Sequence, residues 1–452
     1  MNEFIEQPRY VCALGSQQTV LGIPRSVPVV HAGPGCCAKL SHALNIGGEG
    51  FAGVAMIPCT NSTQNEVIFG GEDKLRETID GALKLYAAEL FVVLTGCTAD
   101  IVGDDVETLV AEYRRRGVAI VNADTGGFKA NNFVGHELVL KAIIAQLLQG
   151  AAPRRQKGLV NVFSVLPYQH PFWRGDLEQL QRLIESIGLK ANILFGQTSA
   201  GAAEWRAIPR AEFSLVLSPW VGLEAAQLAE ELFGVPYLHY PTLPVGALES
   251  SRFLRTLADF AGIARARVEK VVAREENWYY DYFRTLATHY TQSRSPYPNR
   301  LYSATDAAYA LAFASYLVHE LGFVTEEQFL IDDVPERYQE NVREQFAALD
   351  SDQAARVVFE TDGGLIHTAL NAKKYKPSTT LFLGSSWERD LAWKFKGFCL
   401  EVSLPMHYNY IMNKSYLGYG GGLRFLEDLF TNIYLQNANA VRNRVIMADY
   451  GH

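Results

Sequence analysis

Short apolar runs alternate along the chain with longer segments of helical spacing. Continuous runs such as LFVVL at 90–94 and TLFL at 380–383 are typical of buried parallel strands. Residues 177–187 instead place leucine and isoleucine three and four positions apart, which predicts an amphipathic helix capped by Asp176 and ended by Gly188. This alternation of strands and helices predicts an α/β protein with parallel sheets.

The same pattern continues over most of the chain. Further strands are expected at 26–30, 118–121, 159–165, 191–195, 213–217, 237–240, 357–359 and 400–402. Further helices are expected from the cap Asp104-Asp105 through Arg115, at about 268–290, at 307–321 and, after a glycine-rich turn at 418–422, at 423–435.

The 452 residues correspond to about three domains at roughly 150 residues each. The polar, proline- and glycine-containing stretch 150–158 is a candidate linker. We therefore expect three doubly wound, Rossmann-like α/β domains with parallel sheets, at 1–155, 156–300 and 301–452, the last with a C-terminal interface tail.

Composition narrows the classes of function. A net charge of −8 argues against nucleic acid as a partner, and the run Arg114-Arg115-Arg116 is typical of a solvated helix end. The acidic start has no apolar signal region, and the longest apolar helical stretch, 307–318, is too short for a membrane span. We expect a cytoplasmic protein whose six cysteines are reduced thiols or metal ligands.

Three cysteines stand where ligands bind in doubly wound sheets. Cys36 and Cys97 each follow a predicted strand and a glycine, and Cys12 lies in a loop ahead of the first strand. Soft thiolates suit iron–sulfur clusters, and neighbouring glycines (Gly15, Gly33, Gly35 and Gly96) would let backbone amides approach one. Spacing alone leaves open that these cysteines only fill the core.

The surrounding segments carry a resemblance. CALGSQQTVLGI (12–23), HAGPGC (31–36), NEVIFGGEDKLRETI (65–79) and TGCTADIVGDDVE (95–107) resemble the nitrogenase component 1 family, in the family's order and at similar separations. The tail at 404–429, LPMHYNYIMNKSYLGYGGGLRFLEDL, looks like the end of the family's β-type subunits. The middle of the chain matches only in its strand–helix rhythm.

The resemblance implies that Cys12, Cys36 and Cys97 are the ligands one subunit gives to a P-cluster, and so that 1–155 is the cluster-binding domain. The cluster would be of the eight-iron type, shared with the partner subunit, with a four-iron cluster as the alternative. Cys37 is an alternative to its neighbour Cys36, Cys59 is a possible spare ligand, and Cys399 is expected in the core.

The resemblance also implies a division of labour. Catalytic α-type subunits hold their cofactor with a mid-chain cysteine and a late histidine, whereas here no cysteine lies between Cys97 and Cys399, although the tail offers His407. We therefore expect an electron-relay subunit with no catalytic residue of its own. Its partners would be an α-type (D-type) catalytic subunit, in an α2β2 heterotetramer, and a transient, ATP-dependent iron protein.

The substrate is less constrained. Only eleven residues precede Cys12, unlike molybdenum-type β subunits, and the short start and divergent middle look most like methylthio-alkane reductases, which cleave carbon–sulfur bonds to release methanethiol and a hydrocarbon. The β subunit of an iron-only or vanadium nitrogenase is the enzyme-class alternative. Reductases of tetrapyrroles are set below it, because they usually carry a simpler four-iron cluster with ligands split unevenly between subunits. Alternatives of other classes are a cofactor-assembly scaffold and a metal-free binding module.

Other polar and aromatic residues have structural interpretations. His31 is expected to close the glycine turn, and Asp104 and Asp105 are expected to cap a helix. These two carboxylates and the nearby Glu66 are not expected to act as acid–base catalysts. The aromatic stretch 277–283 is expected at a subunit interface.

Overall fold

The computed structural model describes residues 11–38, 57–292, 297–349, 356–375 and 379–449. By internal contacts the chain divides into two compact units. Residues 8–241 and 410–414 form one, here called the cysteine unit, and residues 1–7, 242–409 and 415–452 form the other, here called the C-terminal unit. This division is coarser than the three expected segments, whose boundaries remain a prediction.

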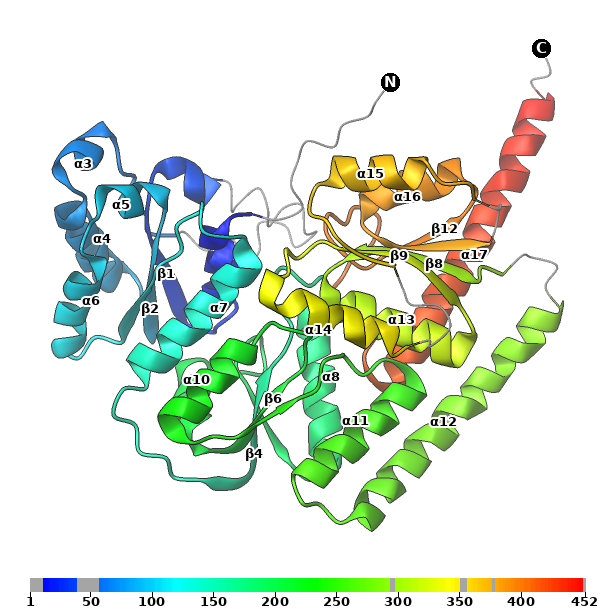
Figure 1. Ribbon diagram of the computed structural model, residues 1–452, viewed down its shortest axis with the longest axis horizontal. Coiled ribbons are helices and arrows are strands. Elements are labelled where there is room, and N and C mark those ends of the chain that lie inside the picture. The colour runs from blue at the N-terminus through cyan, green and yellow to red at the C-terminus, as the bar shows by residue number, and fades with distance from the viewer. Residues whose placement is uncertain (1–10, 39–56, 293–296, 350–355, 376–378, 450–452) are drawn as a thin grey trace. The chain divides into compact units, whose positions relative to one another are not determined.

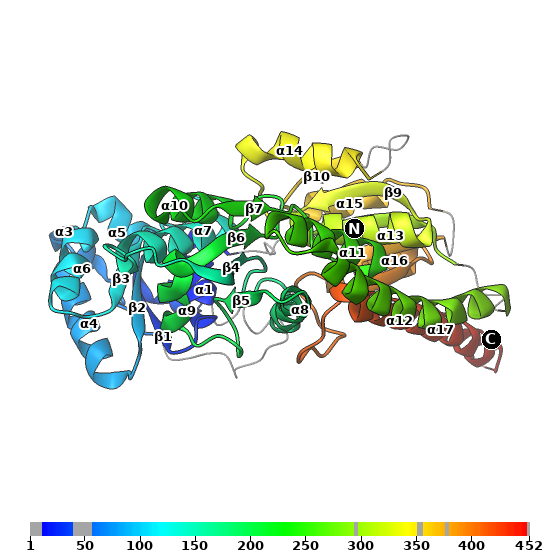
Figure 2. The same cartoon turned by 90° about the horizontal axis from the view of Figure 1, so that it is seen from below.

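The cysteine unit begins with a three-stranded parallel sheet in the order β1-β2-β3 (Figure 1 and Figure 2). Helices α4 and α6 cover one face with Leu75, Ile79 and Val110, while α1 and α7 contact the edge strands. The elements are the helices η1 (Ala13–Ser16), α1 (Gln17–Leu21), α3 (Gln64–Phe69), α4 (Glu72–Leu85), α5 (Cys97–Val102), α6 (Val106–Arg115), α7 (Asn132–Ala142) and η3 (Ile143–Leu147), with strands β1 (Ser26–His31), β2 (Leu90–Thr95) and β3 (Ile120–Ala123).

A second parallel sheet of the same unit has the order β5-β4-β6-β7. Helices α8 and α9 contact β5, and α10 contacts β6 and β7 (Figure 2). Its elements are β4 (Gln156–Phe163), α8 (Trp173–Ser186), β5 (Lys190–Ile193), α9 (Ala202–Ala207), η4 (Ile208–Arg210), β6 (Ala211–Val216), α10 (Leu223–Phe233) and β7 (Tyr237–His239).

The C-terminal unit holds a five-stranded parallel sheet in the doubly wound order β10-β9-β8-β11-β12. Helix α13 contacts β8 and β9, and α16 contacts β11 and β12. Its elements are α11 (Gly246–Phe260), α12 (Arg265–Gln292), β8 (Arg300–Thr305), α13 (Ala307–Leu321), β9 (Val324–Leu330), α14 (Glu336–Ala347), β10 (Arg356–Phe359), α15 (Gly363–Asn371), β11 (Thr380–Gly384), α16 (Ser386–Lys394), β12 (Phe398–Glu401) and α17 (Gly418–Asp449).

The fold class expected from the sequence is confirmed, because all three sheets are parallel and flanked by helices. In the part of the chain that is described, no helix has the length and apolarity needed to cross a bilayer. Cys399 is buried in β12, as expected.

Two local expectations were wrong. Helix α8 begins at Trp173, and the Asp176 N–H already donates to the Phe172 carbonyl (2.9 Å), so Asp176 lies inside the first turn, buried, and is not the cap. The glycines at 418–422 form no turn but the start of α17. There Gly422 packs closely, since a Cβ would come within 2.7 Å of the Gly246 Cα.

Candidate metal centre

The carboxyl edge of the first sheet gathers the expected ligands. Cys97 follows β2 and is the first residue of α5, and Cys36 lies in a helical turn shortly after β1. Cys12 reaches the same edge through a bridge to Asn131, with the Ala13 N–H donating to the Ala130 carbonyl (2.8 Å). Segments far apart in the sequence therefore deliver thiols to one place.

Gly127 is the point where two of these thiols meet. Its N–H donates to the Cys97 Sγ at 3.1 Å. A Cβ added at Gly127 would lie 2.9 Å from the Cys12 Sγ and 3.0 Å from the Cys97 Sγ, so only glycine leaves room for both sulfur atoms. Cys12 is exposed and Cys97 partly exposed, so the thiols lie at the surface of the unit.

Cys36 belongs to the same group of thiols. Its own burial, and then the nearby Cys12, Cys59 and Cys97, raise the pKa of the Cys36 thiol. Mutual repulsion of this kind is what a bound cation relieves, because metal ligation requires thiolates. The three cysteines expected from the sequence thus lie together, and Cys59 is with them.

Cys59 and Cys37 form a pair of hydrogen-bonded thiols. The bond from Cys37 lowers the pKa of Cys59 to about 7, against an opposing effect of burial, and the same bond raises the pKa of Cys37. The Asn61 N–H also donates to the Cys59 Sγ (3.4 Å). Cys59 is therefore the sulfur with the most thiolate character of this pair.

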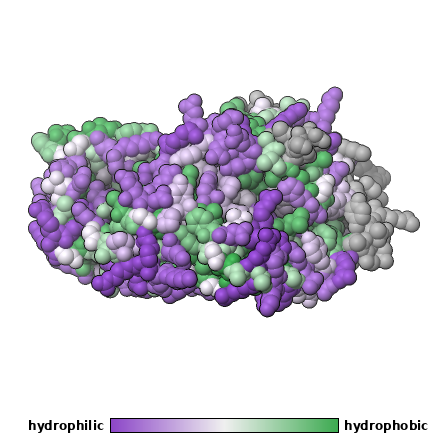
Figure 3. All heavy atoms as spheres, turned by 60° about the horizontal axis from the view of Figure 1, so that its bottom comes forward, coloured by the Kyte–Doolittle hydropathy of each residue, from purple (hydrophilic) through white to green (hydrophobic). Residues whose placement is uncertain are grey.

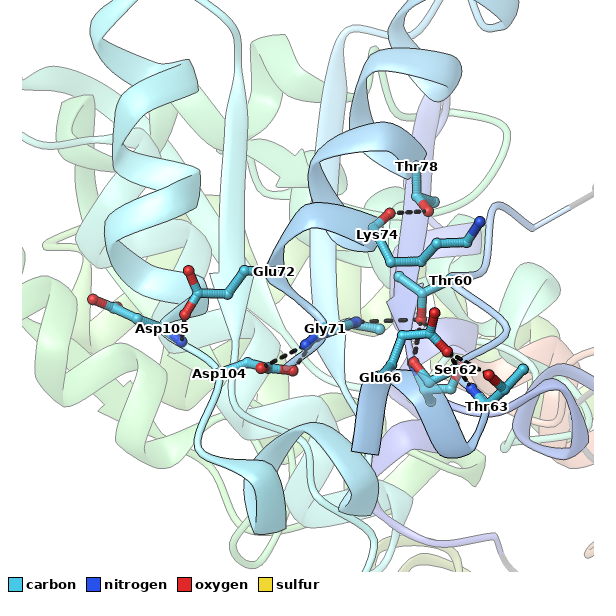
Figure 4. Close-up of polar contacts among 12 residues, drawn as sticks. Thr60, Ser62, Thr63, Glu66, Gly71, Glu72, Lys74, Thr78, Asp104 and Asp105 are labelled. Carbon is cyan, nitrogen blue, oxygen red and sulfur yellow. Dashed lines mark hydrogen bonds and ion pairs between the residues drawn. The ribbon is translucent and has the colours of Figure 1, made fainter. Parts of the chain in front are cut away.

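Buried hydrogen bonds through His31 hold the surrounding loops. His31 bonds the Thr60 hydroxyl (3.2 Å) through Nδ1 and the Asp104 carboxylate (2.9 Å) through Nε2. The other Asp104 oxygen accepts the Gly71 N–H (2.8 Å), as Figure 4 shows. His31 thus has a structural role, as expected, but it connects the cysteine loop to three other segments rather than closing one turn.

Two of the three carboxylates near the cysteines cap helices, and the expectation that Asp104 caps α6 was wrong. Asp105 caps α6 by accepting the Thr108 N–H (3.1 Å), and Glu66 completes a capping box with Thr63 (Figure 4). The hydrogen bonds from Thr108 lower the pKa of Asp105. Asp104 does not cap α6, since its carboxylate is committed to His31 and Gly71.

An iron–sulfur cluster fits this donor set. Among the described residues, no group of three or more His, Cys, Asp and Glu side chains is arranged to hold a single metal ion. A cluster binds each cysteine through a different iron atom, so its ligands stand farther apart than those of one ion. Surface thiols, the close approach of two sulfur atoms to Gly127 and an amide aimed at sulfur are features that suit such a cluster.

The glycine that matters here differs from those expected. A Cβ at Gly15 would collide with the side chains of Val11 and Asn132, and a Cβ at Gly96 would come within 2.6 Å of the Ala32 Cβ. Both glycines therefore serve close packing. Gly127 lies far from any cysteine in the sequence, after β3. The adjacent pair Gly126-Gly127, five residues after the end of the strand predicted at 118–121, was the signal that could have found it.

A family model described as "Nitrogenase component 1 type Oxidoreductase" matches residues 12–434. The chain belongs to this family. Within the nitrogenase component 1 family, one relative is the B-type subunit of the light-independent protochlorophyllide reductase of Bradyrhizobium sp. (strain ORS 278), 25% identical over 77% of this chain and 65% of its own length. The vanadium-iron protein beta chain of Trichormus variabilis is 24% identical over 56% of this chain and 58% of its own.

Solved nitrogenase structures share the fold of this family member. The structure titled "Nitrogenase Cp1 at pH 6.5" aligns with a TM-score of 0.76 over 97% of this chain and 96% of that chain, at 17% sequence identity. The chain spans about 65% of the length of the protochlorophyllide reductase relative that it matches, and less of the nitrogenase beta chains.

Proposed function

We propose that this chain is the β-type, electron-relay subunit of a two-component, ATP-dependent nitrogenase-like reductase. Cys12, Cys36 and Cys97 would hold one half of a P-cluster-type cluster. When bound, such a cluster supplies one-electron transfer at low potential. The observation that carries the proposal is the meeting of Cys12 and Cys97 on Gly127 with Cys36 close by. Relatives that are beta chains or B-type subunits support the β-type assignment.

The exposure of the thiols supports a shared cluster. Cys12 is exposed and Cys36 and Cys97 are partly exposed, so one side of the ligand set is open to a second chain. Three thiolates satisfy half of an eight-iron cluster and leave the remaining ligands to an α-type partner. The same three thiolates would suit a four-iron cluster, which is the alternative. We propose an α2β2 assembly on this basis, and a cytoplasmic location because free cysteines stay reduced there.

An apolar surface beside the site suits a transient electron donor. Ile68 and Phe69 of α3, Ile101 of α5 and Phe128 after β3 have exposed fractions of 70%, 79%, 76% and 62%. Helices α3 and α5 are in contact, and hydrophobic residues gather at the α3 end of this unit in Figure 3. We propose that these four residues, the apolar rim, contact the iron protein.

The test of cluster binding is the Cys97→Ala variant, purified without oxygen together with its partner chain. We expect loss of iron and acid-labile sulfide and loss of substrate reduction, with circular dichroism close to the parent because the β1-β2-β3 sheet does not depend on this sulfur. Cys399→Ala, which changes a buried cysteine of β12, is the matched control and should keep its iron. Full iron content and turnover in Cys97→Ala would refute the assignment.

For the reaction, we propose reductive cleavage of a small methylthio compound. Two electrons and two protons convert the carbon–sulfur bond of R–S–CH3 into R–H and CH3SH. Support comes from the resemblance of the chain's divergent middle to that branch of the family. The test supplies the complex with a methylthio-alkane, ATP and iron protein and measures methanethiol with the hydrocarbon. Dinitrogen reduction without thiol release would favour an iron-only or vanadium nitrogenase.

A second candidate reaction is tetrapyrrole reduction. It is favoured by the protochlorophyllide reductase relative, whose alignment covers 77% of this chain. Reduction of protochlorophyllide by the same complex, with no release of methanethiol, would establish it. A complex that binds clusters but reduces none of these substrates would instead indicate an assembly scaffold, and an iron-free complex a metal-free binding module.

A further inference from the structure

The loop at 124–131, between β3 and α7, connects two of the cysteine-bearing segments. At one end, Asn131 bridges to Cys12, and the Asn132 N–H donates to the Val11 carbonyl (3.0 Å). In its middle, the Gly127 N–H donates to the Cys97 Sγ. The geometry of the two thiols therefore depends on where this loop lies.

Few apolar contacts hold the outer part of the loop. Phe128 is 62% exposed, so its ring does not anchor the backbone in the core. The inner part is fixed by Thr125, whose hydroxyl donates to the Thr95 carbonyl (2.9 Å) at the end of β2. Between Thr125 and Ala130, whose carbonyl accepts the Ala13 N–H, a further attachment is needed to keep Gly127 against sulfur.

Lys129 supplies that attachment. Its ammonium group forms an ion pair with Asp100 of α5 (2.9 Å) and a second one with Asp124 at the start of the loop. The Asp100 side chain is only 11% exposed and packs so closely on the loop that a Cβ at Gly126 would overlap its Oδ2 at 1.9 Å. Since α5 begins with Cys97, this ion pair ties the loop to the helix that presents the ligand.

The charges explain why a cation is needed here. Without Lys129, two carboxylates would face each other across the loop beside a group of thiolates, and like charges at short range repel. The repulsion would favour movement of the loop away from α5. The Gly127 N–H would then leave the Cys97 sulfur.

We propose that Lys129 is a positioning residue for the cluster site: through Asp100 and Asp124 it clamps the loop at 124–131 so that the Gly127 amide stays on the Cys97 sulfur. The inference rests on the proposed function for its redox consequence. Hydrogen bonds to cluster sulfur atoms stabilise the reduced state and raise the reduction potential. Lys129 would thus set the potential without touching the cluster.

The test compares Lys129→Met, Asp100→Asn and Lys129→Arg in the full chain with its partner. In hydrogen–deuterium exchange, we expect the peptide covering 124–131 to exchange about fivefold faster in Lys129→Met and Asp100→Asn, the effect expected for loss of a partly buried ion pair. Lys129→Arg keeps both pairs and should stay near the parent. Lys74→Met, which removes a surface ion pair with Glu77, is the matched control.

A redox titration followed by electron paramagnetic resonance separates positioning from charge alone. Lys129→Met removes a positive charge and Asp100→Asn a negative one, so a purely electrostatic effect moves their midpoint potentials in opposite directions. If Lys129 and Asp100 act by holding the Gly127 amide on the Cys97 sulfur, both variants lose that hydrogen bond. The midpoint potential of the cluster should then be more negative in both, at full iron content. Opposite shifts, or unchanged loop exchange, would overturn the inference.

The two proposals can fail separately. If the parent complex contains no iron, the proposed function fails, while the exchange measurement still reports whether Lys129 clamps the loop. If the parent contains the cluster and Lys129→Met changes neither exchange nor potential, only the role of Lys129 is lost.

Discussion

At the scale of single residues, hydrogen bonds to sulfur distinguish the cysteines of this site. Cys97 accepts a backbone N–H from Gly127, and Cys59 accepts one from Asn61 and a thiol hydrogen from Cys37. The bonds to Cys59 stabilise its thiolate, the form that binds metal and attacks electrophiles. The cysteines of the site are therefore chemically unequal before any metal binds.

This inequality predicts selective alkylation of the metal-free protein. Because the pKa of Cys59 is lowered to about 7, its reaction with iodoacetamide should rise to a plateau with a midpoint near pH 7. In Cys37→Ser, a serine hydroxyl is a poorer partner for sulfur, so the midpoint should move upward. Peptide mass spectrometry across pH 5–9 measures both profiles, and a Cys59 midpoint at the ordinary thiol pKa in the parent chain would contradict the expectation.

Cys59 also tests the choice of ligands. We expect Cys59→Ala to keep most of its iron, because the ligand set comprises Cys12, Cys36 and Cys97. Iron and acid-labile sulfide are measured in the oxygen-free complex, with Cys97→Ala as the negative reference. Since Cys59 lies in the same group of thiols, loss of the cluster in Cys59→Ala would show that it replaces one of the three.

At the scale of elements, a buried carboxylate on α7 serves the start of α10. Glu137 accepts the N–H groups of Gly222 and Ala225 at the amino end of α10. Burial nevertheless raises its pKa to about 7, the hydrogen bonds opposing this effect. The folded protein therefore binds a proton here between about pH 4.5 and 7 that the unfolded chain has released.

The sign of this linkage yields a pH-dependent stability prediction. A raised carboxyl pKa means that the stability contributed by protonated Glu137 is present below about pH 4.5 and is lost as the pH rises through about 7, by about 3 kcal/mol in total. Glu137→Gln cannot titrate, so its thermal midpoint should gain on the parent between pH 5 and 8 in scanning calorimetry. A constant difference over that range would count against the assignment.

Elements with simple patterns were predictable from the sequence, and elements with buried polar residues were not. Helix α13 was expected at its observed bounds, since its apolar sequence is continuous. The central strands β8 and β9 were missed, because buried Ser303 and Gln328 break the apolar run. These two side chains satisfy each other by a 2.6 Å hydrogen bond, a pairing that only the sheet register reveals.

The candidate site was predictable only in part for a similar reason. Cys36 and Cys97 follow strands, so their common edge could be inferred. Cys12 precedes the first strand, and its position depends on a bridge to Asn131 that no local pattern encodes. Gly127 and Lys129 act through contacts across the loop, which is why the sequence alone did not single them out.

At the scale of the whole molecule, the apolar rim is exposed among the residues that the structure describes. We expect Phe69→Ala to lower substrate reduction about tenfold at limiting iron protein, as loss of a central aromatic contact does, and to leave iron content unchanged. Saturating iron protein should restore the rate. Leu85→Ala, at the far end of α4 and 82% exposed, is the control. Equal rates for both variants at limiting iron protein would exclude the rim from docking.

The bridge between Cys12 and Asn131 has a consequence for biogenesis. The two residues are 131 − 12 = 119 positions apart. Contacts this distant in sequence form late, because closing a long loop costs conformational entropy before the contact contributes any stabilisation. A nascent chain thus acquires Cys36 and Cys97 before Cys12 is placed beside them. Metal delivered before residue 131 has emerged from the ribosome would meet an incomplete ligand set, so assembly of the three-cysteine site has to wait for that part of the chain.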